Sequence, residues 1–308
     1  MKMKKENLYL LFLFLLFSHF PTPSNSIDSE FSFQEKLVFD PSYPIEPAEI
    51  KKFPHIIGSP ASYGIPYDDL FLTTKDGVRI HGWFLKQTEN EKAPTFILFH
   101  GNYGHVGLTL PRARWLYDQG MNVLVIDYRG YGRSEGTPSE AGVYMDADAA
   151  LDFVLGKQQS SSSSSSSNSN SNANNNNANA ISKQQKGKSS SSSSSSSSKS
   201  NFVFVMGHSM GGAVAIDLAK RRGNELAGLV VENTFTSLRE AAEDTYAVFR
   251  LFRWLVKAIQ RISMNNISKV GSLELPVLFL CGLRDENIKP RHSSRLYEKR
   301  KRMWIGDE

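Results

Sequence analysis

Short apolar runs separated by longer amphipathic stretches make up most of the chain after residue 70. Five runs have the length and composition of strands buried inside a sheet: residues 95–100, 122–127, 202–206, 228–232 and 276–281. Helical patterns follow at residues 110–119, 139–155, from near Gly211 onward, and at 292–300. Strands that alternate with helices form βαβ units, so the pattern predicts an α/β fold with a mostly parallel sheet and helices on both faces.

Two local patterns refine this outline. Residues 70–74 and 78–86 alternate apolar and polar side chains on either side of Lys75-Asp76-Gly77, which predicts a β-hairpin ahead of the parallel strands. Within residues 139–155, the helical period directs four apolar side chains toward the core: Ala141, Val143, Met145 and Ala149.

The N-terminus has the pattern of a targeting segment. Three lysines within residues 1–6 precede an apolar run at 8–17, which is too short for a membrane span of about twenty residues. We expect residues 1–26 to be a signal peptide or signal-anchor and residues 27–66 a linker and N-terminal extension. The domain at 67–308 would then face the lumen of the endoplasmic reticulum in the secretory pathway, membrane-anchored or lumenal. The sequon at Asn266 would be a usable glycosylation acceptor there.

The composition of one internal segment is not typical of a packed domain. Residues 157–200 consist mainly of serine runs, an asparagine tract and a few lysines. Such a segment has little to bury, so we expect a disordered insert within one domain. Its length costs little because the entropy of loop closure grows only logarithmically.

The composition and charge of the chain limit the classes of function that it can have. The 308 residues are 40% hydrophobic, enough for one large α/β domain. The net charge of +5 comes from the N-terminal tail, the insert and residues 291–302, while both signs mix elsewhere, so we expect no nucleic-acid partner. A single cysteine, Cys281, excludes an intrachain disulfide. No Cys/His cluster has zinc spacing, and we expect neither a metal nor a cofactor.

Residues 201–212 read NFVFVMGHSMGG, a short strand that runs into a sharp turn and then a helix. This is the nucleophile-elbow pattern, with Ser209 at the tip of the turn. Gly207 and Gly211 remove side chains that would collide with the neighbouring strand or helix. The helix N-terminus offers free N–H groups to an oxyanion, and the N–H of Met210 is the first of them.

Four segments follow one another along the chain in this order: HGNYGHVG, DYRGYGRSEGTPSEAG, GHSMGGAVAIDLA and VENTFTSL. Together they resemble the α/β-hydrolase superfamily, and within it the membrane-associated group of Bem46 and α/β-hydrolase domain-containing protein 13. The resemblance covers roughly residues 70–297 apart from the insert. It implies the α/β-hydrolase fold with a small helical cap, which we expect at residues 236–272.

The resemblance also implies the roles of individual residues. Ser209 would be the nucleophile and Asp285, after the strand at 276–281, the triad acid, with Glu232 as runner-up. Met210 and Asn102 would donate backbone N–H groups to the oxyanion, Tyr103 being the neighbouring option.

Several other polar residues have structural interpretations. We expect His100 to shape the loop after its strand and His208 to point away from the site. For Asp127 and Arg129 we expect a local ion pair that holds the DYRGYG turn.

The triad histidine has no clear position in the sequence. The resemblance implies a histidine loop after one more strand, which would begin at residues 301–305, and we expect that strand and loop to be missing from this chain. His292 is the only histidine after Asp285 and a weak alternative base. A serine without a base is a poor nucleophile.

Two functions remain open. One is a serine hydrolase acting on an ester, thioester or lipid acyl bond at a membrane, through an acyl-enzyme on Ser209. Apolar cap residues would line its acyl pocket: Phe249, Leu251, Phe252, Trp254, Leu255 and Ile259. The alternative is a catalytically inactive or C-terminally truncated relative that serves as a membrane-associated binding protein.

Overall fold

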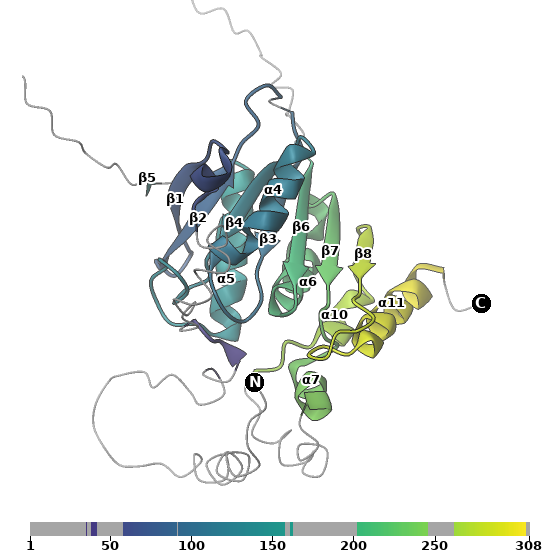
Figure 1. Ribbon diagram of the computed structural model, residues 1–308. Helices are drawn as coiled ribbons and strands as arrows, with labels where there is room; N and C mark the ends of the chain where they lie inside the picture. The colour runs from purple at the N-terminus through teal and green to yellow at the C-terminus, as the bar shows by residue number, and fades with distance from the viewer. Residues whose placement is uncertain are drawn as a thin grey trace, which may run out of the picture. The chain divides into compact units, whose positions relative to one another are not determined.

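A single twisted sheet of eight strands forms the centre of the fold, in the order β5-β1-β2-β4-β3-β6-β7-β8 (Figure 1). The computed structural model describes residues 35, 38–41, 58–90, 92–157, 161–162, 202–245 and 262–305. These residues all belong to one compact unit, Phe33–Glu308. The strands are β1 (Asp68–Thr73), β2 (Arg79–Leu85), β3 (Thr95–Phe99), β4 (Asn122–Ile126), β5 (Ser161–Ser162), β6 (Val203–His208), β7 (Gly228–Glu232) and β8 (Val277–Leu280).

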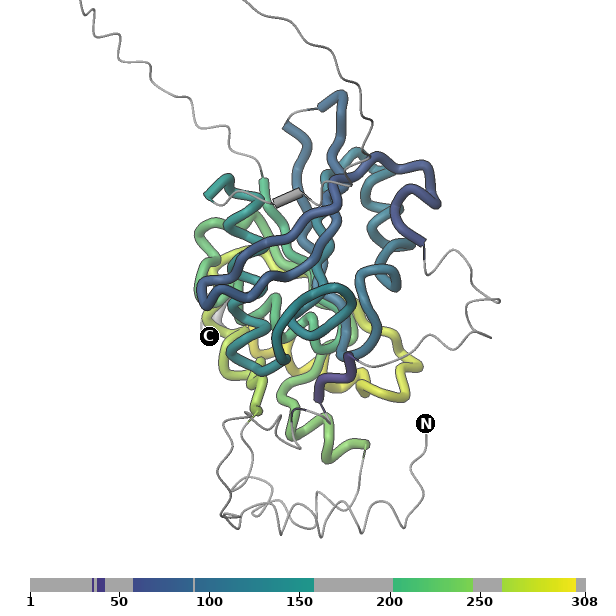
Figure 2. The backbone as a smooth tube through the Cα atoms, turned by 90° about the vertical axis from the view of Figure 1, so that its left-hand side faces the viewer, coloured from purple at the N-terminus to yellow at the C-terminus, as the bar shows by residue number. Residues whose placement is uncertain are grey.

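The strand directions confirm the predicted α/β class. β4, β3, β6, β7 and β8 run parallel to one another, while β1 and β2 form the predicted antiparallel hairpin. β2 joins the parallel part by pairing antiparallel with β4. Figure 2, viewed from the β1 edge, shows this hairpin in front of the other strands.

Helices cover both faces of the sheet, as the alternation predicted (Figure 1). They are α4 (Leu110–Asp118), α5 (Glu140–Val154), α6 (Met210–Arg222), α7 (Leu238–Thr245), α10 (Asn266–Val270) and α11 (Pro290–Ile305), with 3₁₀ turns η2 (Pro60–Tyr63), η3 (Val106–Thr109) and η4 (Gly223–Glu225). Among these helices, none combines the length and apolar character that crossing a bilayer requires. The predicted leader at 1–26 lies outside the described residues.

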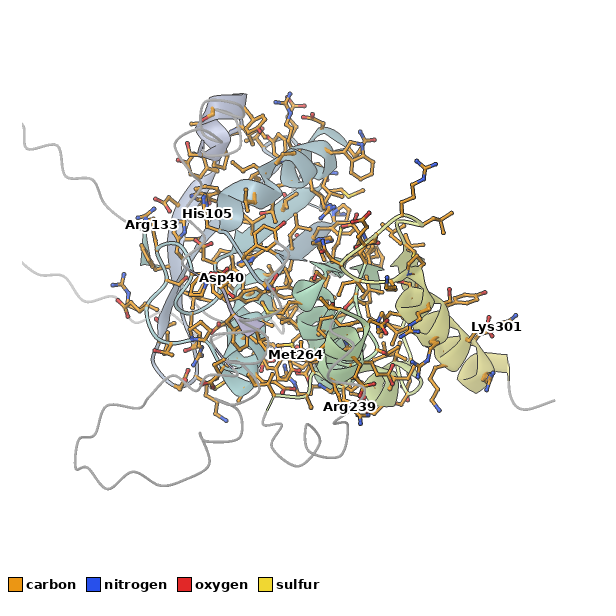
Figure 3. The ribbon with its side chains drawn as sticks, turned by 60° about the horizontal axis from the view of Figure 1, so that its bottom comes forward. Asp40, His105, Arg133, Arg239, Met264 and Lys301 are labelled. Atoms are coloured by element: carbon orange, nitrogen blue, oxygen red, sulfur yellow. The ribbon has the colours of Figure 1, made fainter. Side chains whose placement is uncertain are left out.

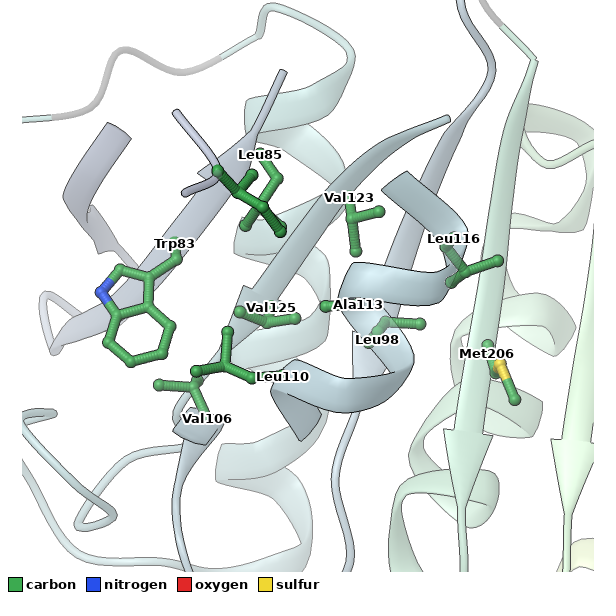
Figure 4. Packing of buried hydrophobic residues seen from close by; sticks show 11 residues of the cluster. Trp83, Leu85, Leu98, Val106, Leu110, Ala113, Leu116, Val123, Val125 and Met206 are labelled. Carbon is green, nitrogen blue, oxygen red and sulfur yellow. The ribbon is translucent and has the colours of Figure 1, made fainter. Parts of the chain in front are cut away.

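One hydrophobic cluster fills the space between α4 and the sheet (Figure 4). Val123 and Val125 of β4 meet Leu110 and Ala113 of α4 there, and Met206 of β6 extends the cluster toward the elbow. Because side chains alternate along a strand, Leu124 and Ile126 of β4 lie on the opposite face, where they are also buried. Burial on both faces explains why this strand reads as a continuous apolar run.

α5 lies where the sequence predicted, but its buried face differs. Val143 and Ala149 are buried as expected, whereas Ala141 is exposed and Met145 only half-buried. Asp146 is buried in their place because its carboxylate pairs with the side chain of Arg129.

Two residues of the predicted insert lie in the sheet. Ser161–Ser162 form the short edge strand β5, which pairs antiparallel with Leu70 and Phe71 of β1. Lys157 lies three residues after the end of α5 at Val154 and forms an ion pair with Glu225. Most of the segment lies outside the described residues, so its predicted bounds stay a prediction.

The last described strand and helix correct one expectation. α11 runs to Ile305, so residues 301–305 are helical and do not begin a strand. Its buried stripe of His292, Leu296 and Arg300 recurs every four residues, which is the period of a helix packed on one side. Within the described part of the chain, β8 lies at one end of the sheet.

Candidate active site

Ser209 occupies the sharp turn between β6 and α6. Its backbone has φ 54° and ψ −118°, a region that non-glycine residues rarely adopt. Two hydrogen bonds from the end of β7 and the segment after it hold it there: the N–H of Ser209 donates to the carbonyl of Glu232 (2.9 Å), and the hydroxyl of Thr234 donates to the carbonyl of Ser209 (2.8 Å). Sequence reasoning missed Thr234, although it lies in the VENTFTSL segment.

The glycines around Ser209 are required by close backbone contacts. A Cβ on Gly207 would lie 2.1 Å from the carbonyl oxygen of Gly211, in the first turn of α6. A Cβ on Gly211 would lie 2.1 Å from the carbonyl oxygen of Phe99, at the end of β3. Backbone atoms cannot move aside as side chains can, so the predicted reason for both glycines is confirmed.

The loop after β3 lies against the elbow. A Cβ built on Gly101 would be 3.8 Å from the Cβ of Ser209 and 3.6 Å from Cδ2 of His208. The nucleophile strand and the oxyanion loop predicted from HGNYGHVG are thus neighbours in space.

Side chains hold three successive carbonyl groups of this loop. The hydroxyl of Tyr128 donates to the carbonyl of His100 (3.0 Å), and the hydroxyl of Tyr131 donates to that of Asn102 (2.8 Å). Between them, Nδ1 of His100 donates to the carbonyl of Gly101 (2.8 Å). Both tyrosines come from the DYRGYG segment, whose role as a support for this loop the sequence did not reveal.

His100 shapes the loop, in line with its structural interpretation. Burial lowers the pKa of its imidazole to about 4, so the ring is neutral at pH 7. The carbonyl of Gly101 can only accept a hydrogen bond, and the single ring hydrogen therefore sits on Nδ1.

Asp127 and Arg129 do not pair with each other, so the predicted local ion pair is wrong. Asp127 lies 3.0 Å from Nδ1 of the buried His81 and accepts the N–H of Val106 (2.7 Å). Arg129 bridges Asp146 and Asp76. Each residue ties the turn to a different distant element, which sequence neighbours could not indicate.

His208 and Glu232 lie side by side at the ends of β6 and β7. They are partners in the strand register, and Nδ1 of His208 is 3.2 Å from Oε2 of Glu232. Arg112 of α4 pairs with the same carboxylate. The interaction with His208 is the main cause that lowers the pKa of Glu232. Glu232 therefore anchors two basic groups beside Ser209, consistent with a structural role.

Asp285 lies in the loop after β8, at the same edge of the sheet as Ser209. Its carboxylate accepts the N–H groups of Asn287 (2.8 Å) and Ile288 (2.9 Å), which stabilise the turn. Asn233, at the end of β7, fixes the start of this loop because its side-chain oxygen accepts the N–H of Gly282 (2.7 Å).

His292 belongs to a separate buried network. Its Nδ1 lies 2.8 Å from the hydroxyl of Thr236, and its Nε2 lies 3.1 Å from Asp244. Both ring nitrogens are engaged, and burial lowers the pKa of the ring to about 4. The structure places Gly101, the neighbour of Asn102, beside Ser209, whereas His292 links α7 to α11.

The two ends of the predicted cap are joined at its base. The N–H of Leu238 donates to the carbonyl of Ser263 (3.1 Å), and that of Ile267 donates to the carbonyl of Thr236 (2.9 Å). Figure 3 shows Met264, from this junction, on the same side of the molecule as Asp40. The six apolar residues expected to line a pocket, within 246–261, lie outside the described residues.

The structure contradicts the expectation that Asn266 is a usable glycosylation acceptor. Its side chain is fully buried, and its amide donates to the carbonyl of Phe235 (2.8 Å). The folded domain offers no access to this nitrogen.

An open, mostly parallel sheet with a strained serine between strand and helix defines the class of α/β-hydrolases. Residues 96–279 match the alpha/beta hydrolase family. The chain is 31% identical to the alpha/beta hydrolase domain-containing protein WAV2 of Arabidopsis thaliana, covering 87% of this chain and 76% of that protein. It is 30% identical to protein bem46 of Schizosaccharomyces pombe, covering 84% and 72%. This protein therefore belongs to the alpha/beta hydrolase family and, within it, to the Bem46-like group.

Two further likenesses add to this assignment. The chain is 30% identical to the uncharacterized membrane protein YNL320W of Saccharomyces cerevisiae, covering 89% of this chain and 79% of that protein. Among solved structures, an esterase of Pyrococcus furiosus superposes with a TM-score of 0.56 at 21% identity, covering 80% of this chain and 82% of that one. The structural likeness supports the fold.

Proposed function

We propose that this hydrolase cleaves an ester, thioester or lipid acyl bond through an acyl-enzyme on Ser209. The observation that carries the proposal is the strained turn at Ser209, held against the loop of Gly101 and Asn102. Strain of this kind persists where the surrounding structure maintains it, and it exposes the serine side chain to a substrate. The esterase of Pyrococcus furiosus shares the fold, which agrees with this chemistry.

In the proposed reaction, Oγ of Ser209 attacks the acyl carbon, and the bond to the alcohol or thiol breaks. Water then attacks the acyl-enzyme and releases the acid. The N–H groups of Met210 and Asn102 would stabilise the negative charge on the carbonyl oxygen, and Asp285 would orient the base. The hydroxyl proton must pass to that base, the one role for which the described residues offer no candidate.

A second candidate function rests on that same gap. The Ser209 hydroxyl forms no hydrogen bond to a histidine within the described ranges, and His292 is engaged with Thr236 and Asp244. A chain that keeps the elbow but lacks turnover would act as a binding protein for the same class of acyl ligands.

A fluorophosphonate probe tests the proposal on the full chain. We expect labelling of the folded protein that is lost in Ser209→Ala and after heat denaturation. Labelling that persists in Ser209→Ala, or a folded protein that is never labelled, would refute Ser209 as nucleophile. Turnover of p-nitrophenyl esters separates the two functions: a labelled chain without turnover supports the binding protein.

For the location, we propose that the N-terminal segment directs the domain to the lumen of the endoplasmic reticulum and associates it with the membrane. The three lysines before the apolar run and the name of the yeast relative support this proposal. Protease protection in intact microsomes tests it, and full digestion without detergent would contradict it. Because Asn266 is buried, glycosylation at that position is unsuitable as a reporter.

A further inference from the structure

A short stretch of the N-terminal extension is bonded to the oxyanion loop. The backbone N–H of Asp40 donates to the carbonyl of Asn102 (2.8 Å), and Asp40 forms an isolated parallel bridge with Tyr103. The neighbouring Phe39 is almost fully buried, so this contact is anchored by apolar packing. In Figure 2 the purple segment that contains Asp40 passes beside the loop that follows β3.

The same carbonyl has a second donor from a distant part of the chain. The hydroxyl of Tyr131 lies 2.8 Å from the carbonyl oxygen of Asn102. Burial raises the pKa of Tyr131, so the phenol keeps its proton and remains a donor. A carbonyl oxygen has two lone pairs, and here Asp40 and Tyr131 each occupy one.

Holding a carbonyl fixes the N–H on the other side of its peptide bond. A peptide unit is planar and trans, so its C=O and N–H point in opposite directions. The carbonyl of Asn102 therefore fixes the N–H of Tyr103, and the carbonyl of Gly101, held by His100, fixes the N–H of Asn102. These two N–H groups are the candidates for the second oxyanion donor.

We infer that Asp40, through its backbone, and Tyr131 are positioning residues for the oxyanion hole, an inference that rests on the proposed serine-hydrolase function. They act through the peptide unit that joins Asn102 to Tyr103, whose N–H is the neighbouring option for the second donor, and do not touch the substrate. An oxyanion donor must lie about 2.7–3.1 Å from the developing charge, so a peptide that rotates freely loses most of its effect. The N-terminal extension is then part of the catalytic framework.

Three variants of the full chain test the inference. Asp40→Pro removes the N–H, because proline has none, while Asp40→Ala keeps it and serves as the matched control. Residue 40 already precedes a proline, Pro41, which favours an extended backbone that tolerates the first change. Tyr131→Phe removes only the hydroxyl.

We expect amide exchange in residues 101–105 to become faster in Asp40→Pro and Tyr131→Phe and to stay unchanged in Asp40→Ala. Fluorophosphonate labelling of Ser209 should show a maximal rate about tenfold lower in the same two variants, with the half-saturating probe concentration unchanged. Loss of a whole oxyanion donor costs about 10²–10³ in rate, and a loosened donor loses part of that. If the contacts were merely structural, the two variants would change the melting temperature, but their maximal labelling rate would not fall at an unchanged half-saturating probe concentration.

Each alternative outcome decides the question. Unchanged exchange in both Asp40→Pro and Tyr131→Phe refutes the inference, whatever the labelling. Faster exchange with an unchanged labelling rate also refutes it, because the loop would then be held without serving the hole. If the wild-type chain is not labelled at Ser209 at all, the proposed function fails, and exchange alone shows whether Asp40 and Tyr131 hold the loop.

Discussion

Ser209 is held in its turn by residues that lie far from it in the sequence. Glu232, at the end of β7, and Thr234, just after it, form hydrogen bonds with its backbone, and the end of β3 lies against the first turn of α6. The serine was predictable from the spacing of its glycines. Thr234 was not, because a threonine in a loop segment carries no signal until the partner of its hydroxyl is known.

At this scale, Thr234→Val should weaken both the fold and the elbow. The change keeps the shape of the side chain but leaves the carbonyl of Ser209 without its buried donor, which costs about 1–2 kcal/mol. We expect this loss in urea unfolding, together with slower fluorophosphonate labelling. Thr234→Ser keeps the hydroxyl and should behave like the wild type, and equal behaviour of the valine variant would contradict this role.

A second residue-scale prediction separates close contact from backbone conformation. Gly207→Ala places a methyl group 2.1 Å from a backbone oxygen and should destabilise the domain by more than about 3 kcal/mol. Gly120 has φ +83° with open space around it, so Gly120→Ala should cost only about 1 kcal/mol. Equal losses in chemical denaturation would show that the contact at Gly207 relaxes easily.

At the scale of elements, the pattern of apolar runs located the strands well. β7 has the predicted limits and β8 is one residue shorter at each end, because buried strands leave an unambiguous apolar signature. The errors fall where a distant partner decides. Asp146 is buried because Arg129 pairs with it, and residues 301–305 continue α11, which packs through His292, Leu296 and Arg300.

The candidate site, like the strands and helices, could be predicted from the sequence only in part. The sequence indicated the turn at Ser209 and the loop at Asn102, because the glycines of these segments and the order of the segments along the chain are specific to the fold. It did not indicate the supports of that loop, Tyr128, Tyr131 and the backbone of Asp40, because their hydroxyl and N–H groups gain a role only through contacts across the fold.

The edge strand β8 leads to a prediction about association. Leu278 is 54% exposed on a strand that ends the described sheet, so an exposed apolar side chain lies at an edge of that sheet. Leu278→Lys should reduce concentration-dependent association in sedimentation velocity and change stability by less than about 0.5 kcal/mol. Leu283→Lys alters a residue that is 85% exposed but lies in the loop beyond the strand. Equal improvement by both variants would argue against edge pairing.

At the scale of the whole molecule, buried histidines make stability depend on pH. Burial lowers the pKa of His292 to about 4, below the value of about 6.5 in an unfolded chain. Between these two pKa values the unfolded chain binds a proton at this imidazole and the native state does not. The free energy of unfolding therefore falls as the pH falls from about 6.5 to about 4. His100, with a pKa also lowered to about 4 by burial, acts in the same direction.

The expected loss is about 2 kcal/mol per histidine between pH 7 and pH 5. Urea unfolding of the wild type and of His292→Gln at both pH values measures it, and groups common to both proteins cancel in the comparison. The variant should be less stable at pH 7 yet lose about 2 kcal/mol less on acidification. Parallel losses in the two proteins would show that His292 does not contribute.

The order of strands in the sheet also sets the order in which the domain can form during synthesis. β1, β2, β3 and β4 are consecutive along the chain and adjacent in the sheet, so they can pair soon after they leave the ribosome. β6, the partner of β3, begins only at Val203. At roughly 5–20 residues per second, the ribosome needs about 4–15 s to pass from β4 to β6. During that interval the side of β3 that pairs with β6 has no strand beside it, and the serine-rich segment lengthens the time for which this side is exposed.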